Sequence, residues 1–323
     1  MSKKLTILFV PISAVGHVNS SIGIAEVLKS RGHRIIFAVD QSFKGRLIQR
    51  GFEEQIVEKE MTDEEQLDPS SYFLKFIKNN KLLDDVSPLE KLIFITENDE
   101  EIFSKKEDQQ INEIINRIKP DVIAVDLWFS PSIIRSGIHW VNINTIQILT
   151  VIDDLRTPPP WLGLPSQVTF RYNGRHHVNV HNVTEWEYYR NFIRDKMSKF
   201  KNNYYRLFQE EGIKHPFPKD RFIESPYLNL YAYPRELDYV DQRPLPTNWH
   251  RFDSFVRLNE EDFEIPEKFK QKTGKLIYFS LGSLGSGNID LMKRLLHLIS
   301  DLPFRFIVSK GKLKVFILLI YYF

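Results

Sequence analysis

The sequence predicts an α/β fold built on parallel sheets, and two observations lead to this class. Within residues 5–39, two apolar runs of strand length flank one amphipathic run of helix length. The same helix-then-strand order returns at residues 111–125 and near the end of the chain. Alternation of this kind builds parallel sheets through right-handed crossovers. A chain of 323 residues is long enough for two such domains.

The expected elements follow from apolar periodicity and from residues that begin or end helices. The first helix is expected to be capped by Asn19 or Ser20 and to end at Gly32 in a left-handed conformation. Pro120 should end the helix of residues 111–118. Weaker periodicity suggests helices around Tyr72–Asn79 and Leu89–Ile95. The remaining expectations are strands at Leu5–Val10, Arg34–Val39, Asp121–Val125, Leu228–Tyr233, Lys275–Ser280 and Phe304–Val308, a long helix from Trp186 to about Gly212, and a helix opened by Asn288.

These elements suggest a two-domain organisation. Residues 1–233 are expected to form the first domain. Residues 234–270 are rich in proline and charge and lack clear periodicity, so we expect a linker there. Residues 271–323 would begin a second domain, with too few elements to enclose a whole sheet.

Composition excludes several function classes. The 44 basic and 42 acidic side chains are interspersed, which offers no broad positive field for nucleic acid. The chain has no cysteine, so disulfides and thiolate metal sites are excluded, and the histidines show no metal-ligand spacing. We see no signal peptide, and the apolar end Val315–Phe323 is shorter than a membrane span. A cytoplasmic protein without a membrane span is therefore expected.

His17 is the first candidate for chemistry. It lies between the first expected strand and helix, at the sheet edge where open α/β sheets bind ligands. Gly16 before it allows close approach of a ligand, and an imidazole can take a hydroxyl proton near neutral pH. A purely structural histidine is the alternative.

Asp126 is the natural partner for that imidazole. It follows the apolar run Val122–Val125, so it should lie on the same sheet edge as His17. A carboxylate that accepts the other ring proton holds and orients a histidine base. A helix-capping or turn aspartate is the alternative.

A glycine-rich loop at Gly282–Gly287 lies between an expected strand and helix. Its backbone amides and the helix amino terminus could hold a diphosphate. The loop lacks the lysine of a triphosphate-binding loop and is not a dinucleotide fingerprint, so by itself this signal is weak.

Together these residues resemble family 1 UDP-sugar-dependent glycosyltransferases. The similarity lies in Ile7–Pro11 with Gly16-His17 and Arg31-Gly32-His33, in Lys119–Ile123 with Asp126, and in Ser136–Val141. It continues in Pro244-Leu245-Pro246, Phe252 and Lys275–Ser283 and extends to Gly311.

The resemblance implies the GT-B fold and inverting sugar transfer from a UDP-sugar to a small lipophilic acceptor. It implies no metal and no cofactor other than the UDP-sugar co-substrate. His17 would deprotonate the acceptor hydroxyl, and Asp126 would stabilise the imidazolium. Gly16, Gly282 and Ser283 would bind the donor diphosphate. A detoxification or secondary-metabolite role is typical of the family.

Two features depart from the family pattern. Asn19-Ser20-Ser21 stands where a proline is usual, and the apolar sequence after Gly311 lacks the family's donor-binding signature. We therefore expect a carboxy-terminally truncated chain, with activity in doubt.

Two other functions stay open at this stage. A non-catalytic module could bind an apolar small molecule through the first domain alone. A nicotinamide dehydrogenase would use Asp40, which ends the second strand, as its ribose-binding acid. The first loop, however, has only Gly16 and does not match the dinucleotide fingerprint.

Overall fold

The computed structural model places two compact units, residues 1–60 with 87–258 and residues 61–86 with 259–323. The residues that the structure describes are 3–71, 86–87, 89–91, 93, 104–160, 162, 164, 170–172, 175–177, 183–214, 222–258, 260, 263–265, 267–270, 274–282 and 288–309. The expected helix around Tyr72–Asn79, residues 92, 94 and 95 of that around Leu89–Ile95, and the apolar end Val315–Phe323 lie outside these ranges.

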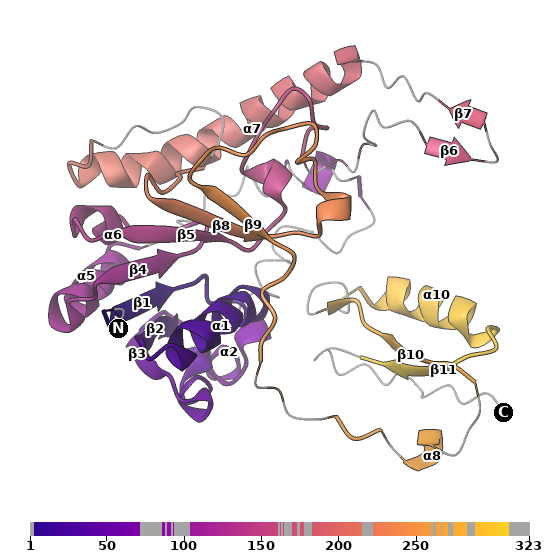
Figure 1. Cartoon of the computed structure of the whole chain (residues 1–323), viewed down its shortest axis with the longest axis horizontal. Coiled ribbons are helices and arrows are strands. Elements are labelled where there is room, and N and C mark those ends of the chain that lie inside the picture. The colour runs from indigo at the N-terminus through magenta and orange to yellow at the C-terminus, as the bar shows by residue number, and fades with distance from the viewer. Residues whose placement is uncertain are drawn as a thin grey trace. The chain divides into compact units, whose positions relative to one another are not determined.

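A seven-stranded sheet organises the first unit, in the order β3-β2-β1-β4-β5-β8-β9 (Figure 1). Every neighbouring pair in it is parallel, which confirms the predicted α/β class. The strands are β1 (Thr6–Val10), β2 (Arg34–Asp40), β3 (Glu53–Val57), β4 (Val122–Val125), β5 (Trp140–Asn144), β8 (Leu228–Ala232) and β9 (Trp249–Phe252).

The other elements of this unit connect those strands. The helices are α1 (Val15–Ser30), α5 (Lys105–Ile118), α6 (Ser132–Arg135) and α7 (Val183–Glu210). Short 3-10 turns lie at η1 (Gln41–Phe43), η2 (Ile48–Arg50), η3 (Ile148–Thr150) and η4 (Arg235–Leu237), and β6 (Phe170–Tyr172) pairs with β7 (Arg175–His177) as a hairpin.

Successive residues of a strand pack alternately into two separate hydrophobic cores, one on each face of the sheet. On β1, Leu8 and Val10 pack with residues of α5, α6 and α7, whereas Ile7 and Phe9 pack with α1. The period of two in a strand sends successive side chains to opposite faces. Helices therefore cover both faces, as a parallel sheet requires.

The first helix begins earlier than its sequence predicts. We expected Asn19 or Ser20 at the cap, but α1 starts at Val15 with Ala14 at the cap position and no side-chain cap. The Ser20 hydroxyl instead donates to the Gly16 carbonyl oxygen at 3.0 Å, the contact typical of a serine inside a helix. His17 consequently lies in the first turn of α1. The expected left-handed end at Gly32 is confirmed, with φ 84°.

The interval 234–270, expected as a linker, also contributes to the sheet. Strand β9 lies within it and pairs in parallel with β8. The segment after β9 then crosses α1: Phe255 packs in the α1 core, and Arg257 donates to Asn19 Oδ1 at 2.9 Å. Asn19 thus contacts the segment that leaves the sheet after β9.

The second unit contains helix α2 (Asp63–Leu67), helix α8 (Glu267–Lys270), strand β10 (Leu276–Phe279), helix α10 (Ile289–Ser300) and strand β11 (Arg305–Val308). Strands β10 and β11 pair in parallel, with α10 between them in the chain. Asn288 caps α10 by accepting the Leu291 N–H at 2.9 Å, as its sequence position predicts.

Candidate active site

Three neighbouring strands bring candidate residues to one edge of the large sheet. Strands β1, β4 and β5 are adjacent, and His17, Asp126 and Thr145 each follow the carboxyl end of one of them. Chain order also reverses between β1 and β4, because β2 lies on the far side of β1. Open α/β sheets bind ligands at such a switch point.

His17 and Asp126, which the sequence analysis expects to be partners, lie within hydrogen-bonding distance. His17 Nδ1 lies 2.7 Å from Asp126 Oδ2. The Asp126 side chain is 1% exposed and the His17 side chain 18% exposed. An ionised carboxylate can only accept, so the shared proton belongs to Nδ1 of a neutral ring, and Nε2 is then the basic nitrogen. This is the arrangement of an oriented histidine base.

Thr145 joins this pair and was not expected from the sequence. Its Oγ1 lies 3.0 Å from both Asp126 carboxylate oxygens and also contacts His17 Nδ1. A hydroxyl has one proton, so donation to Asp126 leaves its lone pairs free to accept. The single Nδ1–H of His17 is then shared between Asp126 Oδ2 and Thr145 Oγ1 as a three-centre hydrogen bond. Thr145 thereby contacts both members of the pair. The sequence does place a polar residue directly after β5, which could have suggested a site residue. That β5 lies next to β4, however, follows only from the tertiary structure.

The loop that carries Asp126 is fixed at two further points. Asp126 Oδ1 accepts the Leu127 N–H at 2.7 Å. The Tyr204 hydroxyl, from α7, binds both backbone groups of Phe129: it accepts from the N–H and donates to the carbonyl oxygen, each at 3.1 Å. Tyr204 is 1% exposed, and its burial raises the pKa of the phenol well above the ordinary value. The carboxylate therefore has little freedom to leave its imidazole partner.

The expected diphosphate-binding residues lie in both units. Gly16 is exposed in the first turn of α1, and nothing lies within 4 Å of where a side chain would begin. Gly282 is exposed after β10, with φ 69°, and its N–H lies 3.2 Å from Ser280 Oγ. Ser283 lies outside the described residues.

Asp40, the acid required by the dehydrogenase alternative, has a structural role. Its Oδ1 accepts the N–H and the hydroxyl of Ser42 and so caps η1. Asp40 is buried, and this burial raises the pKa of its carboxyl. A carboxylate bound to its own turn is poorly placed to bind a ribose.

Among the described residues, no group of three or more histidine, aspartate or glutamate side chains is arranged to hold a metal ion. No helix among the described residues is long and apolar enough to cross a membrane.

Comparison with known proteins shows similarity at the level of structure only. No family model matches the sequence, and no curated protein matches it significantly. Similar solved structures include the glycotransferase of kitacinnamycin, with 15% identity and a TM-score of 0.54 over 96% of this chain and 67% of that one. The calicheamicin glycosyltransferase CalG4 gives 13% and 0.52, over 97% and 66%.

Spinosyn forosaminyltransferase SpnP is similar to the same degree, with 12% identity and a TM-score of 0.52 over 95% of this chain and 65% of that one. The chain thus spans about two thirds of the length of these structures. Identity this low shows the fold alone. The predicted GT-B class is thereby confirmed.

Proposed function

We propose that this chain belongs to an enzyme that transfers a sugar from a UDP-sugar to a hydroxyl of a small lipophilic acceptor, with inversion at the anomeric carbon. The observation that carries the proposal is the contact of His17 with Asp126 and Thr145 at the switch point of a GT-B sheet. Fold similarity to glycosyltransferases supports it.

In the proposed step, His17 Nε2 takes the proton of the acceptor hydroxyl while the acceptor oxygen attacks the anomeric carbon of the sugar. The bond from that carbon to the diphosphate oxygen breaks, and UDP leaves with the electron pair. A single displacement of this kind inverts the anomeric centre. The charge gained by the imidazole is stabilised by Asp126, whose carboxylate is buried against it.

Backbone amides are the proposed donors to the diphosphate of the UDP-sugar. The candidates are Gly282 and Ser283 in the second unit, and Gly16 is a separate candidate in the first unit. The lipophilic acceptor follows from the resemblance to the glycosyltransferase family. Leu127, Ile148, Val151 and Ile152 after β4 and β5 are buried in one apolar cluster, which packs the loops next to the dyad together.

The experiment is transfer from UDP-glucose to a small phenol, with the product's anomeric configuration read by NMR. His17→Ala should lower the rate about 100- to 10,000-fold, the usual contribution of a general base, while phenol binding by calorimetry stays within about threefold. The matched control is His250→Ala, at an exposed histidine of β9.

Each outcome has a separate meaning. Retained transfer in His17→Ala would remove His17 as the base. A product that retains the donor's anomeric configuration would exclude the single displacement. Phenol binding without transfer by any form of the protein would favour a non-catalytic binding role over the enzyme.

A further inference from the structure

Strand β5 ends in an asparagine whose side chain bonds to the backbone just beyond it. Asn144 is the last residue of β5, and its Oδ1 accepts the Ile146 N–H at 3.1 Å. This bond closes an Asx-turn, in which a side-chain oxygen accepts the N–H two residues further along the chain. The residue enclosed by the turn is Thr145, which contacts both His17 and Asp126. Asn144 therefore acts on the backbone that carries the Thr145 side chain.

The register of the sheet shows why a turn is needed at this point. Asn142 of β5 lies opposite Val125, the last residue of β4. Asp126 follows Val125 directly, whereas Thr145 comes three residues after Asn142. At about 3.3 Å per residue, a straight β5 would carry Thr145 roughly 7 Å past the level of Asp126. The turn at Asn144 interrupts this extension, and Thr145 Oγ1 lies 3.0 Å from both carboxylate oxygens.

The burial of Asn144 supports a role beyond packing. The residue is 1% exposed, and among the residues that the structure describes its Nδ2 has no hydrogen-bond partner. A buried N–H₂ group without a partner destabilises a fold, so packing alone would favour leucine at this position. What leucine would lose is the bond to the Ile146 N–H. The turn therefore accounts for an asparagine here better than the packing of the strand does.

A second buried asparagine on β5 provides the comparison. Asn142 lies two residues earlier, so it faces the same side of the sheet as Asn144, and it is 0% exposed. Within the described part of the chain, neither its Oδ1 nor its Nδ2 has a hydrogen-bond partner. The two asparagines thus share their chemistry, strand face and burial. They differ in the bond to the Ile146 N–H.

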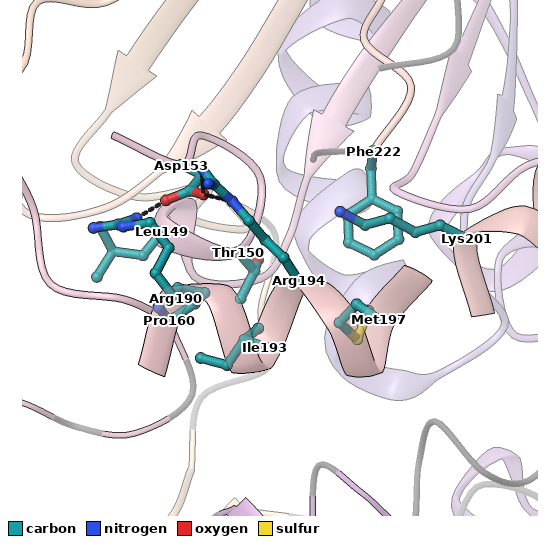
Figure 2. Close-up of a pocket in the computed structure, with 10 residues that line it drawn as sticks. All are labelled: Leu149, Thr150, Asp153, Pro160, Arg190, Ile193, Arg194, Met197, Lys201 and Phe222. Atoms are coloured by element: carbon teal, nitrogen blue, oxygen red, sulfur yellow. Dashed lines mark hydrogen bonds and ion pairs between the residues drawn. The ribbon is translucent and has the colours of Figure 1, made fainter. Parts of the chain in front are cut away.

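The loop that begins at Thr145 is held at a second place by α7. Figure 2 shows Asp153 between the guanidinium groups of Arg190 and Arg194. Arg194 donates to Asp153 Oδ2 through Nε at 3.0 Å and through its terminal nitrogen at 2.7 Å, and Arg190 pairs with Oδ1. The loop should therefore stay attached to α7 when the bond at Asn144 is removed. The effect of that loss is expected in the first residues of the loop.

We propose that Asn144 is a positioning residue for the pair of His17 and Asp126. The turn that it forms holds the Thr145 hydroxyl where this group contacts the carboxylate and the imidazole. The assignment rests on the proposed function, since it names a further residue of the same site. The geometry of the pair, however, can be measured without sugar transfer.

The first test reads the imidazole directly and needs no donor. Thr145 shares the Nδ1 proton of His17, so removing its hydroxyl should change the ¹⁵N shift of His17 Nδ1. Asn144→Leu, which removes the turn bond, should change this shift in the same direction as Thr145→Val. Asn144→Ser should restore most of the original shift, because a serine oxygen can accept the N–H in a similar turn. An unchanged shift in Asn144→Leu would overturn the proposal.

The matched control is Asn142→Leu. It makes the same replacement on the same strand face and removes no hydrogen bond among the described residues. The His17 Nδ1 shift should stay as in the unmodified protein. An equal change in the two leucine variants would show a general effect of packing in β5 and would also overturn the proposal. Circular dichroism checks folding, and Asn144→Ala takes the place of Asn144→Leu if leucine prevents it.

The second test measures sugar transfer in a double-mutant cycle. Asn144→Leu should lower kcat/KM roughly 3- to 10-fold, and the double variant with Thr145→Val should be no slower than Thr145→Val alone. Additive losses would show that Asn144 does not act through Thr145. If no form of the protein transferred sugar, the proposed function would fail, and the NMR comparison would still decide the role of Asn144.

Discussion

Thr145 Oγ1 lies 3.0 Å from both carboxylate oxygens of Asp126, and it contacts the imidazole that Asp126 holds. We therefore predict that Thr145→Val, which keeps the shape and removes the hydroxyl, lowers kcat/KM for sugar transfer roughly 3- to 10-fold, the worth of one hydrogen bond. Thr145→Ser, which keeps the hydroxyl, should retain most of the transfer rate of the unmodified protein. If valine and serine behave alike, Thr145 serves packing and does not position the dyad.

Gly23 allows the segment after β9 to cross α1. A Cβ at this position would lie 2.6 Å from the Phe255 carbonyl oxygen, and a backbone atom cannot easily move away. Gly23→Ala should lower the free energy of unfolding by about 1–3 kcal/mol, measured by urea denaturation. Gly16→Ala in the same helix is the control, because nothing lies within 4 Å of its Cβ. Equal stability of the two variants would contradict this close packing.

Asp108 links α5 to the start of α6, and its charge should make stability depend on pH. Burial raises the pKa of Asp108, but hydrogen bonds from Ser130, Ser132 and Arg135 outweigh it and bring the pKa below the ordinary value. The ionised carboxylate therefore stabilises the fold above the unfolded pKa of about 3.9, and this contribution is lost as pH falls through the lower folded value.

Asp108→Asn should accordingly lower the free energy of unfolding at pH 7 by about 1–3 kcal/mol, with a smaller difference from the unmodified protein at pH 3. Urea titrations at both pH values measure this. Asp241→Asn, at a side chain that is 85% exposed, is the control. A difference that stays constant between pH 7 and pH 3 would show that the Asp108 charge is not responsible.

Much of the first unit could be predicted from the sequence because its signals are local. The apolar run before residue 11 and the stripe of isoleucines before Pro120 mark strand β1 and helix α5 directly. Residues at the ends of parallel strands share one sheet edge, and for this reason the partnership of His17 and Asp126 could be inferred from strand ends alone.

The missed features depend on tertiary structure. Thr145 reaches Asp126 only because β5 adjoins β4. Strand β9 reads Trp-His-Arg-Phe, with two polar residues between two aromatic ones, so its sequence lacks the alternation of apolar and polar residues that marks a strand. The start of α1 was misplaced because polar residues inside the helix look like caps: Ser20 bonds to the helix backbone and Asn19 to Arg257.

The central claim is that Asp126 holds His17 with its proton on Nδ1 and leaves Nε2 as the base. The most direct measurement is ¹⁵N NMR of the protein labelled at histidine, with His17 assigned by comparison with His17→Ala. In the neutral ring we predict a protonated Nδ1 and an unprotonated Nε2, with the preference lost in Asp126→Ala. A proton on Nε2 with a bare Nδ1 facing the carboxylate would contradict the account.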